Sequence, residues 1–138
     1  MSVTYHTHSL SASDFCALHT AVGWDAPSVP AAQKALEHSL VTLCAKDGDK
    51  TVGMGRLVGD DALDFYVKNI IVHPQYQGQG IGMRIMEGLL AYVQAHRIPG
   101  QLAQVALFTT GKEGFYEKLG FYTRPNKELG PGMVLELR

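Results

Sequence analysis

One stretch of the sequence decides the fold, and it reads Asn69-Ile70-Ile71-Val72-His73-Pro74-Gln75-Tyr76-Gln77-Gly78-Gln79-Gly80-Ile81-Gly82-Met83-Arg84. The apolar run Ile70-Ile71-Val72 comes just before Pro74, which predicts the end of a strand buried on both faces. Beyond the glycines, Ile81, Ile85 and Leu89 recur at helical spacing, which predicts an amphipathic helix. The segment therefore predicts a strand, a glycine-rich turn and a helix, in that order.

The glycines at 78, 80 and 82 lie where such a turn meets the helix. They remove Cβ atoms at a place where a ligand could touch the main chain, and a helix N-terminus there offers unpaired N–H groups. Together these features suit a phosphate or pyrophosphate, although a turn that binds nothing has the same pattern. Met83 occupies the last glycine place of a dinucleotide-binding GxGxxG, and no Gly-Lys-Ser/Thr follows, so a Rossmann or Walker loop is excluded.

The rest of the chain surrounds this segment with alternating short elements. Periodicity and turn residues predict early helices near 12–22 and 29–38, a hairpin over 40–58 and a long strand over 62–73. The predicted elements outside these are strands at 3–9, 101–109, 121–124 and 133–137 and helices at 81–93 and 112–119. We expect one α+β domain over residues 1–138, with a mixed central sheet of about six to seven strands flanked by helices.

The composition of the chain disfavours several classes of function. The 138 residues carry 12 Lys+Arg against 13 Asp+Glu, so a nucleic-acid partner that relies on a basic surface is disfavoured. No apolar run approaches the ~18 residues of a membrane span and no leader pattern is visible, so we expect a cytoplasmic protein with no membrane partner. Cys16 and Cys44 lack CxxC spacing, and the six histidines lack an HExxH context, so no metal site is expected.

Two motifs carry a resemblance to a known family. Gln77-Gly78-Gln79-Gly80-Ile81-Gly82 matches the signature Gln/Arg-x-x-Gly-x-Gly/Ala, and Gly114-Phe115-Tyr116-Glu117-Lys118-Leu119-Gly120-Phe121 is similar to an FYxKxGF segment. In this order, with a helix and a strand between them, they resemble the GNAT (GCN5-related) N-acetyltransferases. The resemblance implies a GNAT fold whose sheet opens a V between the strands at 62–73 and 101–109, with acetyl-CoA bound in the V.

The resemblance also assigns roles to matching residues. It implies that the main chain of Ile71, Val72 and His73 contacts the pantetheine arm and that Phe115 flanks the coenzyme. The pyrophosphate would be held by the main chain of the loop, namely Gln77, Gly78, Gln79, Gly80, Ile81, Gly82 and Met83. Tyr116 would be the general acid for the leaving thiolate, and a backbone N–H at a strand bulge near Ile71 would serve the oxyanion.

Two departures from the family pattern affect the site. Gln77 replaces the more frequent arginine, which removes one cation near the phosphates. Many relatives use an acidic side chain on or near the long strand as the base, but Asn69 stands where an aspartate would suit that role, and an asparagine cannot act as a base. Asp64, Tyr66 and His73, each acting through water, remain open alternatives for the base.

The function implied is transfer of an acetyl group from acetyl-CoA to a primary amine of a small-molecule acceptor. Two alternatives remain: acetylation of a protein N-terminus or lysine, and a non-catalytic CoA-binding sensor or regulatory protein. An acidic acceptor groove would favour the first alternative. Family analogy implies a homodimer formed through the last strands, and Trp24 is a candidate for the acceptor pocket or for a packing anchor.

Overall fold

The computed structural model describes residues 2–138, which divide into two compact units, one up to Leu107 and one over Phe108–Arg138. The first unit contains β1 (Val3–Thr7), α1 (Ala12–Ala21), α2 (Val29–Glu37), β2 (Val41–Asp47), β3 (Lys50–Gly59), β4 (Asp64–Val72), the 3-10 turn η1 (Pro74–Tyr76), α3 (Ile81–His96) and β5 (Gln104–Ala106). The second contains α4 (Glu113–Glu117). A single domain over 1–138 stays a prediction.

The first unit is built on one mixed sheet with the strand order β1-β2-β3-β4-β5. The strands from β1 to β4 pair antiparallel, whereas β4 and β5 are parallel. The connection between the parallel strands runs through α3, as a parallel crossover requires. The predicted hairpin, central strand and crossover helix are therefore confirmed.

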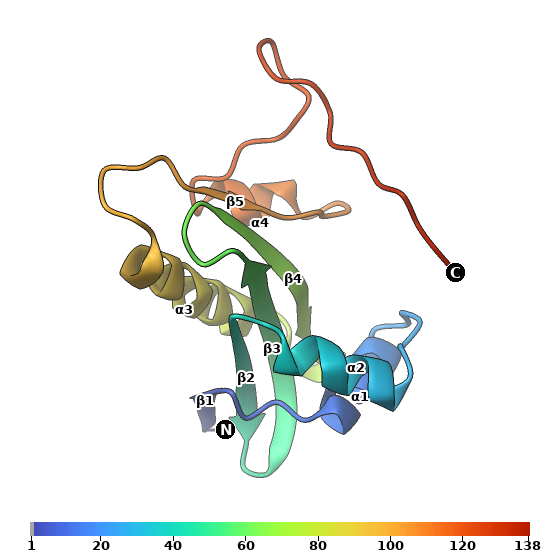
Figure 1. Cartoon of the computed structure of the whole chain (residues 1–138). Helices are drawn as coiled ribbons and strands as arrows, with labels where there is room; N and C mark the ends of the chain where they lie inside the picture. The colour runs from blue at the N-terminus through green and yellow to red at the C-terminus, as the bar shows by residue number, and fades with distance from the viewer. Residues whose placement is uncertain (1) are drawn as a thin grey trace. The chain divides into compact units, whose positions relative to one another are not determined.

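Helices cover both faces of this sheet. Figure 1 shows α3 on one face and the pair α1 and α2 on the other. On the α3 face, Ile81, Ile85 and Leu89 are buried. Gly53 allows the close approach of α3, because a Cβ at this position would lie 2.9 Å from Ile81 Cγ2. On the opposite face, a core cluster joins Phe15 of α1 to the strands.

A β-bulge interrupts the pairing of β3 with β4. Met54 pairs with Ile71 and Arg56 with Lys68, so Gly55 alone lies opposite two residues, Asn69 and Ile70. Asn69 has a φ of +60°, a left-handed conformation that asparagine adopts more readily than most residues. The strand bulge predicted near Ile71 is confirmed.

The strand count needs correction. The described residues form five strands rather than six to seven, because no strand forms over 121–124 or 133–137. The apolar residues of the second segment predict a strand, but a strand also needs a hydrogen-bonding partner. Met133 and Leu135 are 92% and 84% exposed instead. The predicted strand over 101–109 is likewise reduced to Gln104–Ala106, and the helix over 112–119 to Glu113–Glu117.

Candidate functional site

The glycine-rich loop leads into α3 with its main chain uncovered. Gly78 and Gly80 have φ values of +79° and +82°, and a Cβ at either would meet nothing within 4 Å. Gly80 is the N-cap of α3, and no side chain caps this end of the helix. The first-turn amides and the positive end of the helix dipole therefore remain available to an anion, as the sequence predicts.

The loop is tied to the end of β4 by the side chain of Gln77. Its Nε2 donates to the carbonyl oxygen of Val72 at 3.0 Å. The N–H of His73 donates to Val52 O at 2.8 Å and is therefore used within the sheet. Gln77, which replaces an arginine of the family pattern, thus fixes the loop to the strand that precedes it.

Within the first unit, no strand covers one edge of β4 beside this loop. β5 pairs with β4 only over Asp64–Tyr66. From Val67 to Val72, no strand of the first unit pairs with the edge of β4 that faces away from β3. Ile71 and Val72, two of the three residues expected to contact the pantetheine arm, lie on this part of the strand, and His73 follows it.

A chain of hydrogen bonds holds the side chain of Asn69 at the bulge. Asn69 Oδ1 accepts from Arg56 Nε at 2.7 Å, and Asn69 Nδ2 lies 3.3 Å from His19 Nε2. His19 Nδ1 lies 2.8 Å from Phe15 O. Because a carbonyl oxygen only accepts, Nδ1 carries the proton and donates to Phe15, while Nε2 accepts from Asn69. Arg56 Nη1 donates to Ser39 Oγ at 3.3 Å, which connects the bulge to the end of α2.

This network bears on the candidates for the base. Asn69 has both ends of its amide engaged, and it positions the bulge. Burial raises the pKa of Tyr66, which favours the neutral phenol and works against a role as base. His73 Nδ1 accepts a hydrogen bond from the N–H of Gln75 at 3.2 Å, and Asp64 is exposed at the start of β4.

Arg56, His19 and Lys68 belong to the candidate site, and the sequence interpretation did not single them out. Arg56 lies within the otherwise apolar run of β3, and an unexplained charge in a buried strand is the signal that could have found it. Burial lowers the pKa of its guanidinium. Lys68 lies directly opposite Arg56 on β4, with its Nζ 5.3 Å from the centroid of the Tyr66 ring.

Trp24 lies beside the buried His19. The ring centroids are 6.0 Å apart in an edge-on arrangement, and Trp24 is 53% exposed. Its ring therefore covers the histidine that accepts from Asn69 while it keeps a solvent-facing surface. Both predicted roles, packing anchor and pocket lining, are compatible with this position.

A separate pocket of about 290 Å³ lies between α1 and the turn that joins β2 to β3. Its lining includes Asp14, Lys50 and His73. The Asp14 carboxylate already accepts a hydrogen bond from Thr51 Oγ1 at 2.7 Å. Its polar groups are therefore partly satisfied by the fold itself.

The second unit carries the predicted acid. Phe115 and Tyr116 lie on α4 with ring centroids 4.9 Å apart at 85°, and Tyr116 makes a similar edge contact with Phe121 at 6.0 Å. Burial raises the pKa of Tyr116. Its phenol therefore keeps its proton at neutral pH, the state that a general acid needs.

Over residues 2–138, no group of three or more His, Cys, Asp or Glu side chains is placed to hold a metal ion. Across the same residues, no helix has the length and apolar character to cross a membrane.

Comparison with known proteins places this geometry in a family. Residues 38–123 match the acetyltransferase (GNAT) domain family. The chain belongs to the GNAT acetyltransferases. A GNAT-family acetyltransferase from Streptococcus pneumoniae is 35% identical, with 99% of each chain covered and a TM-score of 0.81. A probable acetyltransferase from meticillin-resistant Staphylococcus aureus is 30% identical, with 99% of this chain and 100% of that one covered and a TM-score of 0.87.

A curated relative indicates the kind of reaction found in the family. Serotonin N-acetyltransferase 2, chloroplastic, from Oryza sativa subsp. japonica is 30% identical over 68% of this chain. The match spans 48% of that relative's length. The family match and these neighbours together identify the chain as a GNAT-family N-acetyltransferase, as the two motifs predict.

Proposed function

We propose that this N-acetyltransferase transfers an acetyl group from acetyl-CoA to the primary amine of a small molecule. The observation that carries the proposal is the exposed main chain of the Gln77–Gly82 loop at the uncapped N-terminus of α3. Such a helix end suits the pyrophosphate of the coenzyme. The relative named for serotonin acts on a small amine, which supports the same acceptor class.

The reaction needs a neutral amine, an oxyanion donor and an acid. The amine nitrogen attacks the thioester carbonyl, so that a C–N bond forms and the C–S bond breaks. The nitrogen then loses a proton to water, and the sulfur takes one from Tyr116, which regains it from solvent. A backbone N–H at the bulge beside Ile71 would stabilise the oxyanion.

The role of Tyr116 rests on its motif and on its protonation. A phenol has a reference pKa near 10 and a thiol one near 8.5, so transfer to the thiolate is uphill. Burial raises the pKa of Tyr116 further, which means that the transfer depends on close alignment with the sulfur. Phe115 would flank the coenzyme beside it.

The alternative of a protein acceptor would be supported by an acidic groove. The side of the bulge that faces α1 carries Arg56 and Lys68 instead. A lysine-rich tail would bring its own cations against these two, which costs energy. A small acceptor fits this surface better than a basic peptide does.

A homodimer and a cytoplasmic location remain part of the proposal. The side chains of Met133, Val134, Leu135 and Leu137 are apolar and exposed, which suits strand pairing with a second copy. Sedimentation at micromolar concentration is expected to give the mass of a dimer, and a monomer over the whole concentration range would contradict the dimer.

The first experiment is calorimetric titration with acetyl-CoA, followed by free-thiol release across a panel of amines and peptides. Binding together with thiol release from a small amine is expected. Binding without release from any acceptor would favour the sensor alternative, and no binding would refute the coenzyme role of the loop.

The variant Tyr116→Phe tests the acid. We expect kcat to fall by about 100-fold or more with unchanged acetyl-CoA affinity, as for loss of a general acid. Tyr122→Phe is the matched control, because Tyr122 is 63% exposed and lies outside the proposed chemistry. Equal kcat values for the two variants would remove Tyr116 from the mechanism.

A further inference from the structure

Two cations face α1 beside the bulge. Arg56 and Lys68 are directly opposite each other in the register of β3 and β4, so their side chains share a face of the sheet. Like charges in this arrangement repel. In the part of the chain that the structure describes, neither forms an ion pair with a carboxylate: Arg56 donates to Asn69 and Ser39, and the Lys68 ammonium lies over the ring of Tyr66.

Arg56 keeps a donor for a ligand. Its Nε and Nη1 are used by Asn69 and Ser39, whereas no atom of residues 2–138 accepts a hydrogen bond from Nη2. The side chain is half-buried, and burial lowers its pKa because it removes water from around the charge. A half-buried guanidinium with a free donor and a neighbouring ammonium is suited to a carboxylate or a phosphate.

We infer that Arg56 and Lys68 form a subsite for an anionic group of the acceptor. The acceptor is then a small amine that carries a carboxylate or a phosphate a few bonds from the reacting nitrogen. The inference rests on the proposed acetyl transfer, whose substrate class it narrows. It also predicts that polyamines are poor acceptors, because they would place further positive charge beside the pair.

The position of Arg56 explains why the reacting amine and the anionic group of the acceptor should be only a few bonds apart. Its Nε lies 2.7 Å from Asn69 Oδ1, and Asn69 is itself a bulge residue. The proposed oxyanion donor lies in the same bulge, so an amine that attacks there has the guanidinium close by. A ligand that reaches both needs only a short linker, as in an α-amino acid or a phosphorylated amino alcohol.

The test uses pairs of amines that differ by the anionic group alone. Tryptophan with tryptamine and phenylalanine with phenethylamine test the carboxylate, and O-phosphoethanolamine with ethanolamine tests the phosphate. The readout is the ratio of kcat/KM for the anionic member to that for the neutral member, at saturating acetyl-CoA. We expect a preference of about 10- to 100-fold for the anionic member in one of the two chemistries, the usual effect of a hydrogen bond to a charged group.

Lys68→Met isolates the charge, since methionine keeps an apolar chain over the Tyr66 ring. It is expected to lower the ratio by about 2- to 5-fold, the upper part of the effect of a partly exposed ion pair. Lys34→Met is the matched control, because Lys34 is an exposed lysine of α2. The control should leave the ratio unchanged.

A purely structural role for the two cations would alter both members of a pair equally and leave the ratio unchanged. The inference is overturned if the neutral members are preferred in every pair, or if Lys68→Met and wild type give the same ratio. If no amine is turned over, the proposed function fails, and the subsite is tested separately by binding of N-acetyltryptophan against N-acetyltryptamine. Equal affinities would then refute the subsite, and tighter binding of the acid that Lys68→Met weakens would support it.

Discussion

The two ends of the functional part of β4 are built in opposite ways. Beyond its C-terminal end, the Gln77–Gly82 loop offers main-chain amides on exposed glycines, and its side chains contribute little beyond the bond from Gln77 to Val72. At the bulge, side chains make the site: Asn69 bonds to Arg56 and faces His19. The proposed coenzyme end is therefore local in sequence, whereas the proposed acceptor end is assembled from distant segments.

This difference matches the chemistry expected at each end. A pyrophosphate is the same in every reaction of the family, and unpaired amides at a helix N-terminus recognise it without side chains. An acceptor varies from one enzyme to another, and specificity for it depends on side-chain charge and shape. Substitutions in the loop should therefore change the affinity for the coenzyme, and substitutions at the bulge should change turnover and acceptor choice.

The largest expected effect is a loss of acetyl-CoA affinity when a negative charge is placed in the Gln77–Gly82 loop. Gly80→Asp and Gly80→Asn both adopt the left-handed φ of +82° at a modest cost, and the two differ only in charge. We expect Gly80→Asp to bind acetyl-CoA about 100-fold more weakly than Gly80→Asn, because a carboxylate near the pyrophosphate costs several kcal/mol at close range.

Calorimetric titration of both variants measures this difference, and higher salt should reduce it. Similar affinities for the aspartate and asparagine variants would show that no phosphate lies at the N-terminus of α3. Acceptor preference should not differ between the two, because the bulge is left intact.

A smaller effect is expected from removing the side chain at the other end. Asn69→Gly tolerates the φ of +60° but leaves Arg56 Nε and His19 Nε2 without their partner. We expect a loss of about 1–2 kcal/mol in the free energy of unfolding, the cost of unsatisfied polar groups in a half-buried site. Urea denaturation measures it.

Measurements of turnover distinguish a substitution at the bulge from one in the proposed coenzyme loop. For Asn69→Gly, kcat is expected to fall by roughly 10-fold with unchanged acetyl-CoA affinity, because the released bulge positions the reacting groups less well. Asn69→Ala has the same side-chain loss and adds the strain of a left-handed alanine, so it should be less stable than the glycine variant. Equal stability of the two would contradict the strain, and an unchanged kcat would contradict the positioning role.

The same contrast explains what the sequence could predict. The loop, α3 and β4 follow from glycine spacing, helical periodicity and Pro74, all of which lie within neighbouring residues. The network at the bulge joins residues 13 and 50 positions apart, and a periodic pattern carries no information on which of these side chains meet. The sequence pattern also marks Asn69 as unfit to be a base without indicating that its amide bonds to Arg56.

The prediction of strands over 121–124 and 133–137 was wrong for a related reason. Their aromatic and aliphatic residues suit a strand locally, but a ladder needs a second strand with matching register. In the second unit, the structure supplies no such partner for these residues. Local pattern therefore predicted elements stabilised within one segment better than those that depend on a distant one.

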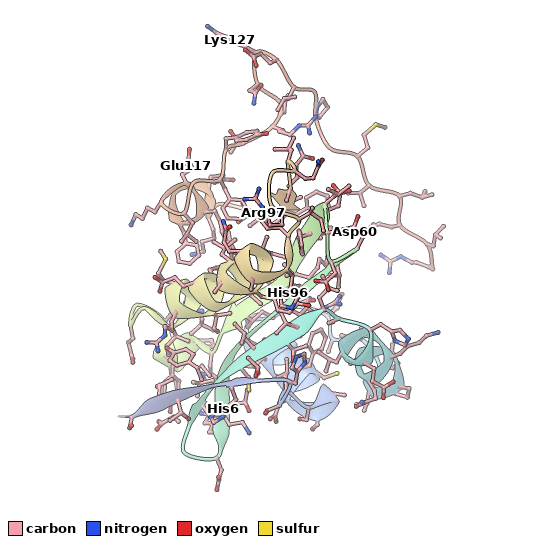
Figure 2. The ribbon with its side chains drawn as sticks, turned by 60° about the vertical axis from the view of Figure 1, so that its left-hand side comes forward. His6, Asp60, His96, Arg97, Glu117 and Lys127 are labelled. Atoms are coloured by element: carbon pink, nitrogen blue, oxygen red, sulfur yellow. The ribbon has the colours of Figure 1, made fainter. Side chains whose placement is uncertain are left out.

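The smallest effect is expected at the turn that feeds β4, where Asp60 lies (Figure 2). Its Oδ1 accepts hydrogen bonds from the N–H groups of Ala62, Leu63 and Asp64 at 2.8–3.0 Å. These bonds hold the pKa of Asp60 below its usual value, the bond from Asp64 most strongly. The folded state therefore binds this proton more weakly than the unfolded chain does, and stability from Asp60 is present above the unfolded pKa and is lost as the pH falls through the folded one.

Asp60→Asn keeps the acceptor oxygen and removes the charge, so its unfolding midpoint should depend less on pH between about 5 and 2 than that of wild type. The effect is small because Asp60 is exposed and its field is screened by water. Since the turn lies at the opposite end of β4 from the glycine loop, acetyl-CoA affinity at neutral pH should be the same in both proteins. A change in that affinity would mean that the start of β4 and the coenzyme loop are coupled through the strand, and the division into two independent ends would have to be abandoned.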